Sequence, residues 1–118
     1  MRSSTVDSEV PGATAVRATE DTLTVELSDG RTISVPLDWY PRLVHATPDE
    51  RNNYELYAES QHIHWPDLDE DIGVEGLLEG RASGESAWSF RRWLEAKRAG
   101  RPLTLDALRQ YDREQAGG

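Results

Sequence analysis

The segment Thr22–Pro36 constrains the fold of this chain most, because its pattern predicts one hairpin in one register. Apolar residues alternate with polar ones on both sides of a turn, as in strands with one buried face, and they are Leu23, Val25, Leu27, Ile33 and Val35. A two-residue turn at Asp29-Gly30 would place the two apolar sets on opposite faces. A three-residue loop, residues 28–30, pairs Val25 with Ile33 and puts Gly30 in the left-handed conformation that glycine adopts without a clash. We therefore expect a bulged hairpin.

The rest of the first eighty residues has the pattern of short strands and short helices. Thr47, Pro48 and Glu50 have the spacing of a capping box with proline in the first turn, which marks a helix start. The pattern also predicts a strand near Thr14–Thr19, a helix capped by Asp38 that runs through Leu43 to Ala46, a hairpin of Tyr54–Ala58 with Gln61–Trp65, and a helix Val74–Glu79 capped by Gly73.

From residue 81 onward the composition changes to that of two helices. Ser86 can cap a helix that runs to about Arg98, and Thr104 can cap a last helix. The predicted fold class is α+β: a small antiparallel sheet of hairpins with short helices, followed by a C-terminal helical hairpin. We expect a disordered leader over residues 1–11, an α+β domain over 12–80, and a basic, Trp-containing helical tail over 81–118.

Composition and charge limit the classes of site and partner. The 118 residues include no cysteine, which excludes disulfides, thiolate nucleophiles and sulfur-ligated metals. No apolar run is long enough to span a membrane, and the first ten residues lack the apolar segment of a secretory signal, so we expect a soluble, cytoplasmic protein. Residues 1–80 hold 5 Arg and 17 Asp+Glu, a net charge of −12, whereas residues 81–118 have a net charge of +3. An acidic body repels nucleic acid and anionic membranes, so we expect it to bind neither.

Four carboxylates lie within the five residues Asp67–Asp71 and suggest a calcium loop. An EF-hand loop needs glycine at its sixth position and glutamate at its twelfth, where this chain has Ile72 and Leu78. The favoured interpretation is a solvated acidic turn that leads into a helix N-terminus, where carboxylates interact well with the helix dipole. Calcium binding is the alternative.

His62 and His64 share one side of a predicted strand, a spacing that can place two imidazoles on one metal ion, and His45 is a candidate third ligand. Nothing in the sequence brings His45 near them, so we expect no metal site. The chain lacks a nucleophile elbow, a Walker loop and a dinucleotide-binding glycine pattern. We therefore expect no catalytic residues and no cofactor, and hence no enzyme.

The tail helix is the best candidate for a binding surface, because tryptophan and arginine are enriched at binding hot spots. Its partner-binding candidates are Trp88, Phe90, Arg91, Arg92 and Trp93. The alternative is that its aromatic residues complete the core of the body. A helix-turn-helix that reads DNA is a further alternative, although the last helix carries Asp106, Asp112 and Glu114 beside its arginines, which suits a phosphate backbone poorly.

Several motifs together resemble the bacterial family catalogued as domain of unknown function 2442, and they are Leu27–Arg31, Leu37–Leu43, Ile63–Ile72 and Glu75–Leu78. The resemblance covers about residues 13–80 and implies a small α+β domain. Members of this family often look like one half of a two-gene cassette similar to toxin–antitoxin pairs, and some carry a C-terminal helix-turn-helix. The family supplies no established catalytic or ligand residues.

We expect a non-enzymatic interaction protein. The most specific form of this hypothesis is an antitoxin-like role toward a small protein encoded in the same cassette. A transcriptional regulator that binds DNA through the C-terminal helical hairpin is the alternative. Homodimerisation is also expected, because three aromatic residues on one short helix exceed what a small body needs to cover.

Overall fold

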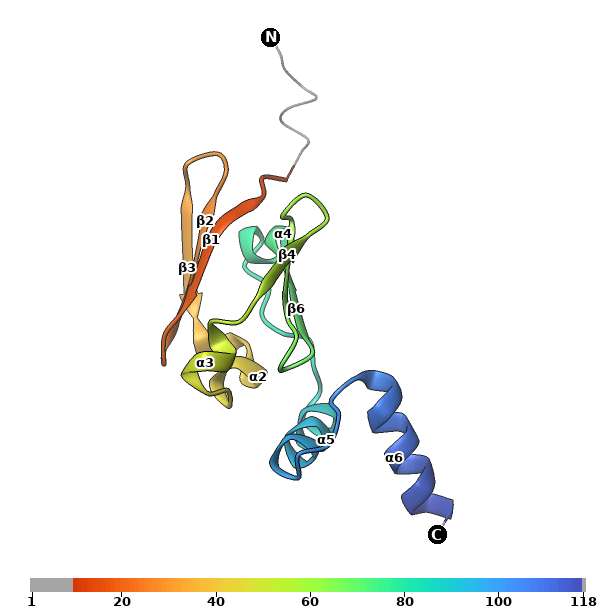
Figure 1. Ribbon diagram of the computed structural model, residues 1–118. Helices are drawn as coiled ribbons and strands as arrows, with labels where there is room; N and C mark the ends of the chain where they lie inside the picture. The colour runs from red at the N-terminus through yellow and green to blue at the C-terminus, as the bar shows by residue number, and fades with distance from the viewer. Residues whose placement is uncertain (1–9, 118) are drawn as a thin grey trace. The chain divides into compact units, whose positions relative to one another are not determined.

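The protein has two compact units, which we describe from a computed structural model that covers residues 10–117. The larger unit ends at Ala82 and the smaller begins at Ser83. The larger unit contains two three-stranded antiparallel sheets with short helices, and the smaller unit contains two longer helices (Figure 1). The predicted α+β class is confirmed, with the strands divided between two sheets. The predicted leader over residues 1–11 lies outside the described residues, except for Val10 and Pro11.

The first sheet has the order β1-β2-β3, with β1 at Ala13–Ala18, β2 at Thr22–Leu27 and β3 at Thr32–Pro36. Val25 pairs with Ile33, and Gly30 has a φ of 93°, so the predicted register and the bulged loop are confirmed. One face of the sheet is apolar and buried, and its members from β2 and β3 include Leu23, Val25, Leu27 and Val35.

The predicted helix with an Asp38 cap is wrong. The segment instead forms a 3-10 turn, η1 (Leu37–Trp39), and a single α-helical turn, α2 (Pro41–Val44). Tyr40 separates them with φ −130° and ψ 86°, because a residue before proline is disfavoured in the helical region. The N-cap of α2 is therefore Tyr40, which makes no side-chain capping bond.

The predicted capping box is confirmed at α3 (Pro48–Arg51). The Glu50 amide donates to Thr47 Oγ1 at 3.2 Å, and the Thr47 amide donates to Glu50 Oε1 at 2.8 Å. This short helix places Arg51 inside the larger unit, where its guanidinium donates to the carbonyl oxygens of Leu43 and Val44 at 2.9 and 3.0 Å. These carbonyls lie at the end of α2, so Arg51 adds charged side-chain donors to a helix end whose Leu43 carbonyl also accepts the Ala46 amide at 3.2 Å.

The second sheet has the order β4-β5-β6, with β4 at Glu55–Tyr57, β5 at His62–Trp65 and β6 at Glu70–Gly73. The sequence did not predict β6, because its carboxylates are unfavourable in strands. The acidic run therefore leads through a turn into a strand and not directly into a helix. The pairing of Ile72 with Ile63 buries both side chains and overrides the weak local preference.

Three consecutive residues in the turn between β4 and β5 are left-handed without being glycine: Ala58, Glu59 and Ser60 have φ values of 53°, 58° and 63°. The start of β1 holds this turn, because the Ala13 amide donates to the Ser60 carbonyl at 2.7 Å. Gly12 allows this approach, since a Cβ at that position would lie 2.7 Å from the Glu59 carbonyl oxygen. The contact ties the two sheets together at this end of the unit.

The remaining helices begin where the sequence predicts. Helix α4 (Val74–Leu78) follows Gly73, which is its N-cap, and Gly80 follows it with a φ of 74°. Helix α5 (Ala87–Arg98) is capped by Ser86, and α6 (Leu105–Gly117) has a bond from the Ala107 amide to Thr104 Oγ1 at 3.2 Å. Within the described part of the chain, no helix combines the length and the apolar character needed to cross a membrane.

Candidate functional site

Helix α5 carries the most exposed large apolar side chain among the described residues, Trp88, with 61% of its surface accessible. The guanidinium of Arg92 lies over its ring, with Cζ 4.4 Å from the ring centroid. Arg92 is itself fixed by α6, because it donates to the Leu108 carbonyl at 3.1 Å and forms an ion pair with Asp112. Trp88 is therefore an exposed aromatic ring backed by an arginine that is bonded to α6.

The five predicted partner-binding residues lie in different surroundings. Trp88 and Arg91 are exposed, Phe90 and Arg92 are half-buried, and Trp93 is fully buried. Phe90 stacks on Trp93, with ring centroids 5.7 Å apart, so this pair belongs to the packed side of the helix. Partner binding at these residues stays a prediction, and Trp88 and Arg91 are the two that are exposed.

A second arginine–aromatic pair supports the helical hairpin, and the sequence did not reveal it. The guanidinium of Arg101, in the turn between α5 and α6, lies 3.5 Å from the centroid of the Tyr111 ring. The two residues border a pocket of about 230 Å³, together with Pro102, Leu108 and others. Tyr111 lies on α6, and its pairing with an arginine ten residues earlier depends on how the chain turns at Gly100, which has a φ of 72°.

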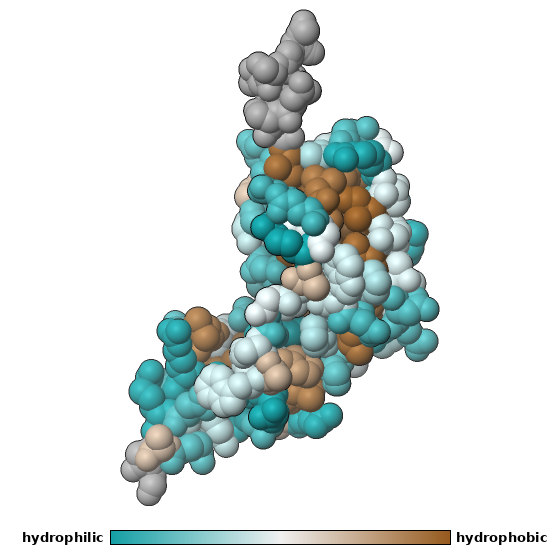
Figure 2. Space-filling model, turned by 180° about the vertical axis from the view of Figure 1, so that it is seen from behind, coloured by the Kyte–Doolittle hydropathy of each residue, from teal (hydrophilic) through white to brown (hydrophobic). Residues whose placement is uncertain are grey.

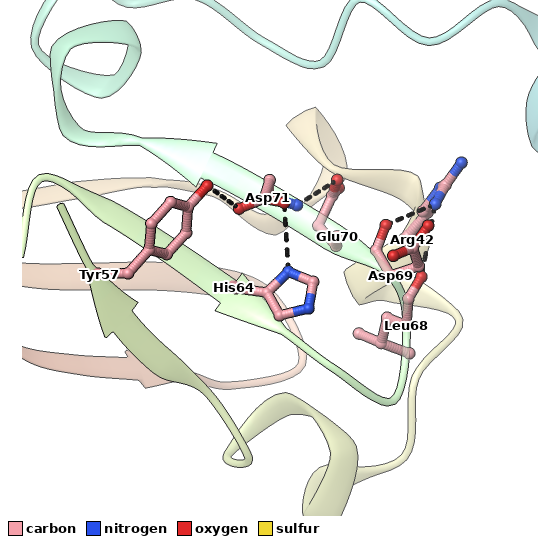
Figure 3. Close-up of polar contacts among 7 residues, drawn as sticks. All are labelled: Arg42, Tyr57, His64, Leu68, Asp69, Glu70 and Asp71. Atoms are coloured by element: carbon pink, nitrogen blue, oxygen red, sulfur yellow. Dashed lines mark hydrogen bonds and ion pairs between the residues drawn. The ribbon is translucent and has the colours of Figure 1, made fainter. Parts of the chain in front are cut away.

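The outer face of the second sheet holds a polar cluster, which we call the Tyr57–Asp71 cluster and which consists of Tyr57, His62, His64 and Asp71. Figure 3 shows three of these residues, Tyr57, His64 and Asp71. The Tyr57 hydroxyl donates to Asp71 Oδ1 at 2.7 Å, and His64 Nδ1 lies 3.2 Å from Asp71 Oδ2. The His62 ring stacks on the Tyr57 ring at 5.1 Å. Side chains from three neighbouring strands thus meet on one exposed surface.

The two strand histidines lie on the same side of β5, as predicted, but each has a different neighbour. His64 contacts Asp71, whereas His62 covers Gly73, where a Cβ would lie 3.5 Å from the imidazole. His45 is on α2, where Nδ1 lies 3.2 Å from the Pro41 carbonyl oxygen. Across residues 10–117, no three histidine or acidic side chains are grouped so that they could hold a metal ion.

The acidic run makes contacts of its own within the fold. Arg42 donates to the carbonyl oxygens of Leu68 and Asp69 at 3.4 and 2.8 Å (Figure 3), and Leu68 is fully buried. Asp67 accepts a hydrogen bond from Asn53 Nδ2 at 2.9 Å. These contacts hold the run in a tight turn between β5 and β6, in which Asp69 has a φ of 52°.

The hydrogen bond to Asp71 raises the pKa of Tyr57 above its usual value of about 10, because the phenol loses this bond when it ionises. We expect Asp71→Asn to lower the pKa of Tyr57, as measured by NMR titration of ¹³C-labelled tyrosines. Tyr40 provides an internal control, since burial is the main cause that raises its pKa and this burial is unchanged in the variant. An unchanged Tyr57 pKa in Asp71→Asn would contradict the contact.

Comparisons with known proteins place the larger unit in a family. The sequence pattern of the family described as "Protein of unknown function (DUF2442)" matches residues 13–83. No protein of curated function matches the sequence. Helices α5 and α6 lie C-terminal to the matched residues, so Trp88 is outside the region that defines the family.

Two solved structures have a similar fold. A protein of unknown function from Rhodospirillum rubrum is 28% identical with a TM-score of 0.57, and the match covers 68% of this chain and 98% of that one. The uncharacterized protein CV0863 from Chromobacterium violaceum is 25% identical with a TM-score of 0.56, and the match covers 74% of this chain and 81% of that one. The chain belongs to the DUF2442 family, which is described as one of unknown function.

Proposed function

We propose that this protein acts by binding another protein, without catalysing a reaction, and that Trp88 on α5 anchors the partner. The observation that carries the proposal is that Trp88 is exposed and yet contacts a bonded side chain. The ring is 61% accessible, and the Arg92 guanidinium that lies over it donates to a carbonyl of α6. A tryptophan that is fixed before binding loses little conformational entropy when a partner covers it. Such residues are typical hot spots of protein interfaces.

The surroundings of Trp88 favour a polar rim around this anchor. Arg91 is exposed on the same helix and can form forked hydrogen bonds with a carboxylate of the partner. Residues 83–118 carry 7 Lys+Arg and 5 Asp+Glu, a net charge of +2, so this unit can approach an acidic surface without strong repulsion. An interface of this kind has an aromatic centre and a charged edge.

We propose an antitoxin-like role as the specific form of this function, with the partner being a small protein encoded in the same gene cassette. The proposal rests on the cassette arrangement that resemblance to the family implies, combined with a binding surface that lies outside the family region. Homodimerisation through the same face is the competing use of Trp88. Transcriptional regulation through α6 is less favoured, because exposed Asp106 and Glu114 accompany Arg109 and Arg113 on that helix.

The test is co-expression of the full chain with the protein encoded by the adjacent gene, followed by measurement of the dissociation constant of the purified complex. We expect Trp88→Ala to weaken binding by about 2 kcal/mol or more, roughly 30-fold. Leu105→Ala is the matched control, because Leu105 on α6 is also exposed, at 54%, and its truncation should leave binding unchanged. Equal affinities for Trp88→Ala and the unmodified chain would reject the anchor, and a homodimer that Trp88→Ala dissociates would reassign it to self-association.

A further inference from the structure

We propose that the free edge of β3 binds an extended, basic segment of a partner protein, which joins the first sheet as a fourth strand. This surface belongs to the larger unit and is independent of the Trp88 anchor. Strand addition of this type derives its affinity from main-chain hydrogen bonds and its selectivity from alternate side chains.

The register of the hairpin leaves two residues of β3 with outward-facing backbone groups. In an antiparallel pair of strands, hydrogen-bonded and non-hydrogen-bonded residue pairs alternate. At the bulged loop the Leu27 amide donates to the Arg31 carbonyl at 2.8 Å, so the next hydrogen-bonded pair is Val25 with Ile33. The amides and carbonyls of Thr32 and Ser34 therefore point away from β2. Among residues 10–117, no backbone or side-chain group bonds to these two amides. Unpaired backbone groups at a sheet edge are the template that an added strand requires.

Each of the other sheet edges is either shorter or has an amide that a side chain already uses. At the edge formed by β1, the Val16 amide donates to the Tyr54 hydroxyl at 3.3 Å. At the edge formed by β6, the Asp71 amide donates to Glu70 Oε1 at 3.1 Å, and the strand carries charged residues. Strand β4 has three residues. By contrast β3 has five residues and no charged side chain, and it ends at Pro36, which has no amide to offer.

The chemistry around β3 favours a basic occupant with alternating apolar residues. Residues 1–82 have 6 Arg and 17 Asp+Glu, a net charge of −11, so this unit attracts a basic segment and repels a second copy of the same acidic unit at this edge. Glu26 lies opposite Thr32 on the outer face of the sheet, and exposed Glu75 lies on α4, which packs against β3 on the inner face. Ile33 is half-buried at the inner side of the edge, and Figure 2 shows apolar residues gathered in a strip on the larger unit.

The experiment uses the full chain and a synthetic peptide of alternating lysine and valine as the probe. A second peptide of the same composition, with its lysines and valines in separate blocks, is the control for charge alone. We expect the alternating peptide to slow hydrogen exchange at the Thr32 and Ser34 amides, measured by NMR, while the block peptide leaves them unchanged. Protection elsewhere with none at these two amides, or no protection at millimolar peptide, would overturn the proposal.

Two variants at position 34 distinguish the contribution of the backbone amide to peptide binding from that of the side chain. Ser34→Pro removes an outward amide that the sheet does not use, and we expect it to weaken peptide binding about tenfold or more, since it deletes one intermolecular hydrogen bond and places a ring against the incoming strand. Ser34→Ala keeps the amide and should bind as the unmodified chain does. Equal binding by a folded Ser34→Pro variant would overturn the proposal, and the exchange measurement on the unmodified chain decides the matter if that variant does not fold.

Discussion

Replacement of Trp65 by alanine is expected to lower the free energy of unfolding of the larger unit by about 4 kcal/mol, as for other large aromatic truncations in cores. Trp65 is fully buried on β5, and its indole Nε1 donates to the Arg51 carbonyl at 2.9 Å. Truncation therefore opens a cavity and also leaves a buried carbonyl without its donor. A loss of this size is a large part of the total stability of a small domain, about 5–15 kcal/mol.

The measurement is denaturant unfolding followed by NMR signals of residues in the larger unit, because a chain with two units need not unfold in one step. Trp88→Ala is the matched control: the residue type is the same, but Trp88 is exposed, so its loss should change stability by about 1 kcal/mol or less. Similar effects of the two truncations would show that Trp65 is not a core residue of this unit.

Replacement of Arg51 by alanine is expected to lower the free energy of unfolding by about 2–4 kcal/mol, because one buried and one half-buried carbonyl lose charged donors. The Arg51 side chain bonds to Leu43 and Val44 at the end of α2, while its own carbonyl accepts the bond from Trp65. It thus connects α2, α3 and β5. Arg51→Lys should lose part of this stability, since an ammonium cannot reproduce the planar fork that spans two carbonyls.

The control for this prediction is Arg81→Ala. Arg81 is exposed, with 63% of its side chain accessible, and it forms an ion pair with Glu79 at 2.9 Å. Removal of such a pair should cost less than about 1 kcal/mol. If Arg51→Ala and Arg81→Ala had equal effects on the denaturation midpoint, the proposed role of Arg51 in closing α2 would be refuted.

Local sequence patterns were sufficient to predict those features of the fold that depend only on neighbouring residues. The bulged hairpin at Gly30, the capping box at Thr47 and the caps of α5 and α6 at Ser86 and Thr104 were all predictable. Each depends on hydrogen bonds or dihedral preferences within a few residues, and these follow from the residue types at short spacings in the sequence. The same patterns were sufficient to recognise the family over residues 13–83.

The features that the sequence misjudged depend on contacts between distant segments. Strand β6 exists because Ile72 pairs with Ile63, although acidic residues disfavour strands. The exposure of Trp88 and the burial of Trp93 could not be read from a helix in which both looked equally apolar. The supports of Trp88 and Tyr111 come from arginines whose positions are set by the turn between α5 and α6.

The sequence by itself determined the fold class, the first hairpin with its register, and the helix starts at residues 48, 74, 87 and 105, because each of these is a local preference of the backbone. Tertiary structure decided the split into two sheets, the partners of the acidic run and the side chains that remain exposed. These depend on which distant apolar surfaces cover each other, and the free energy of that burial outweighs local preference where the two disagree.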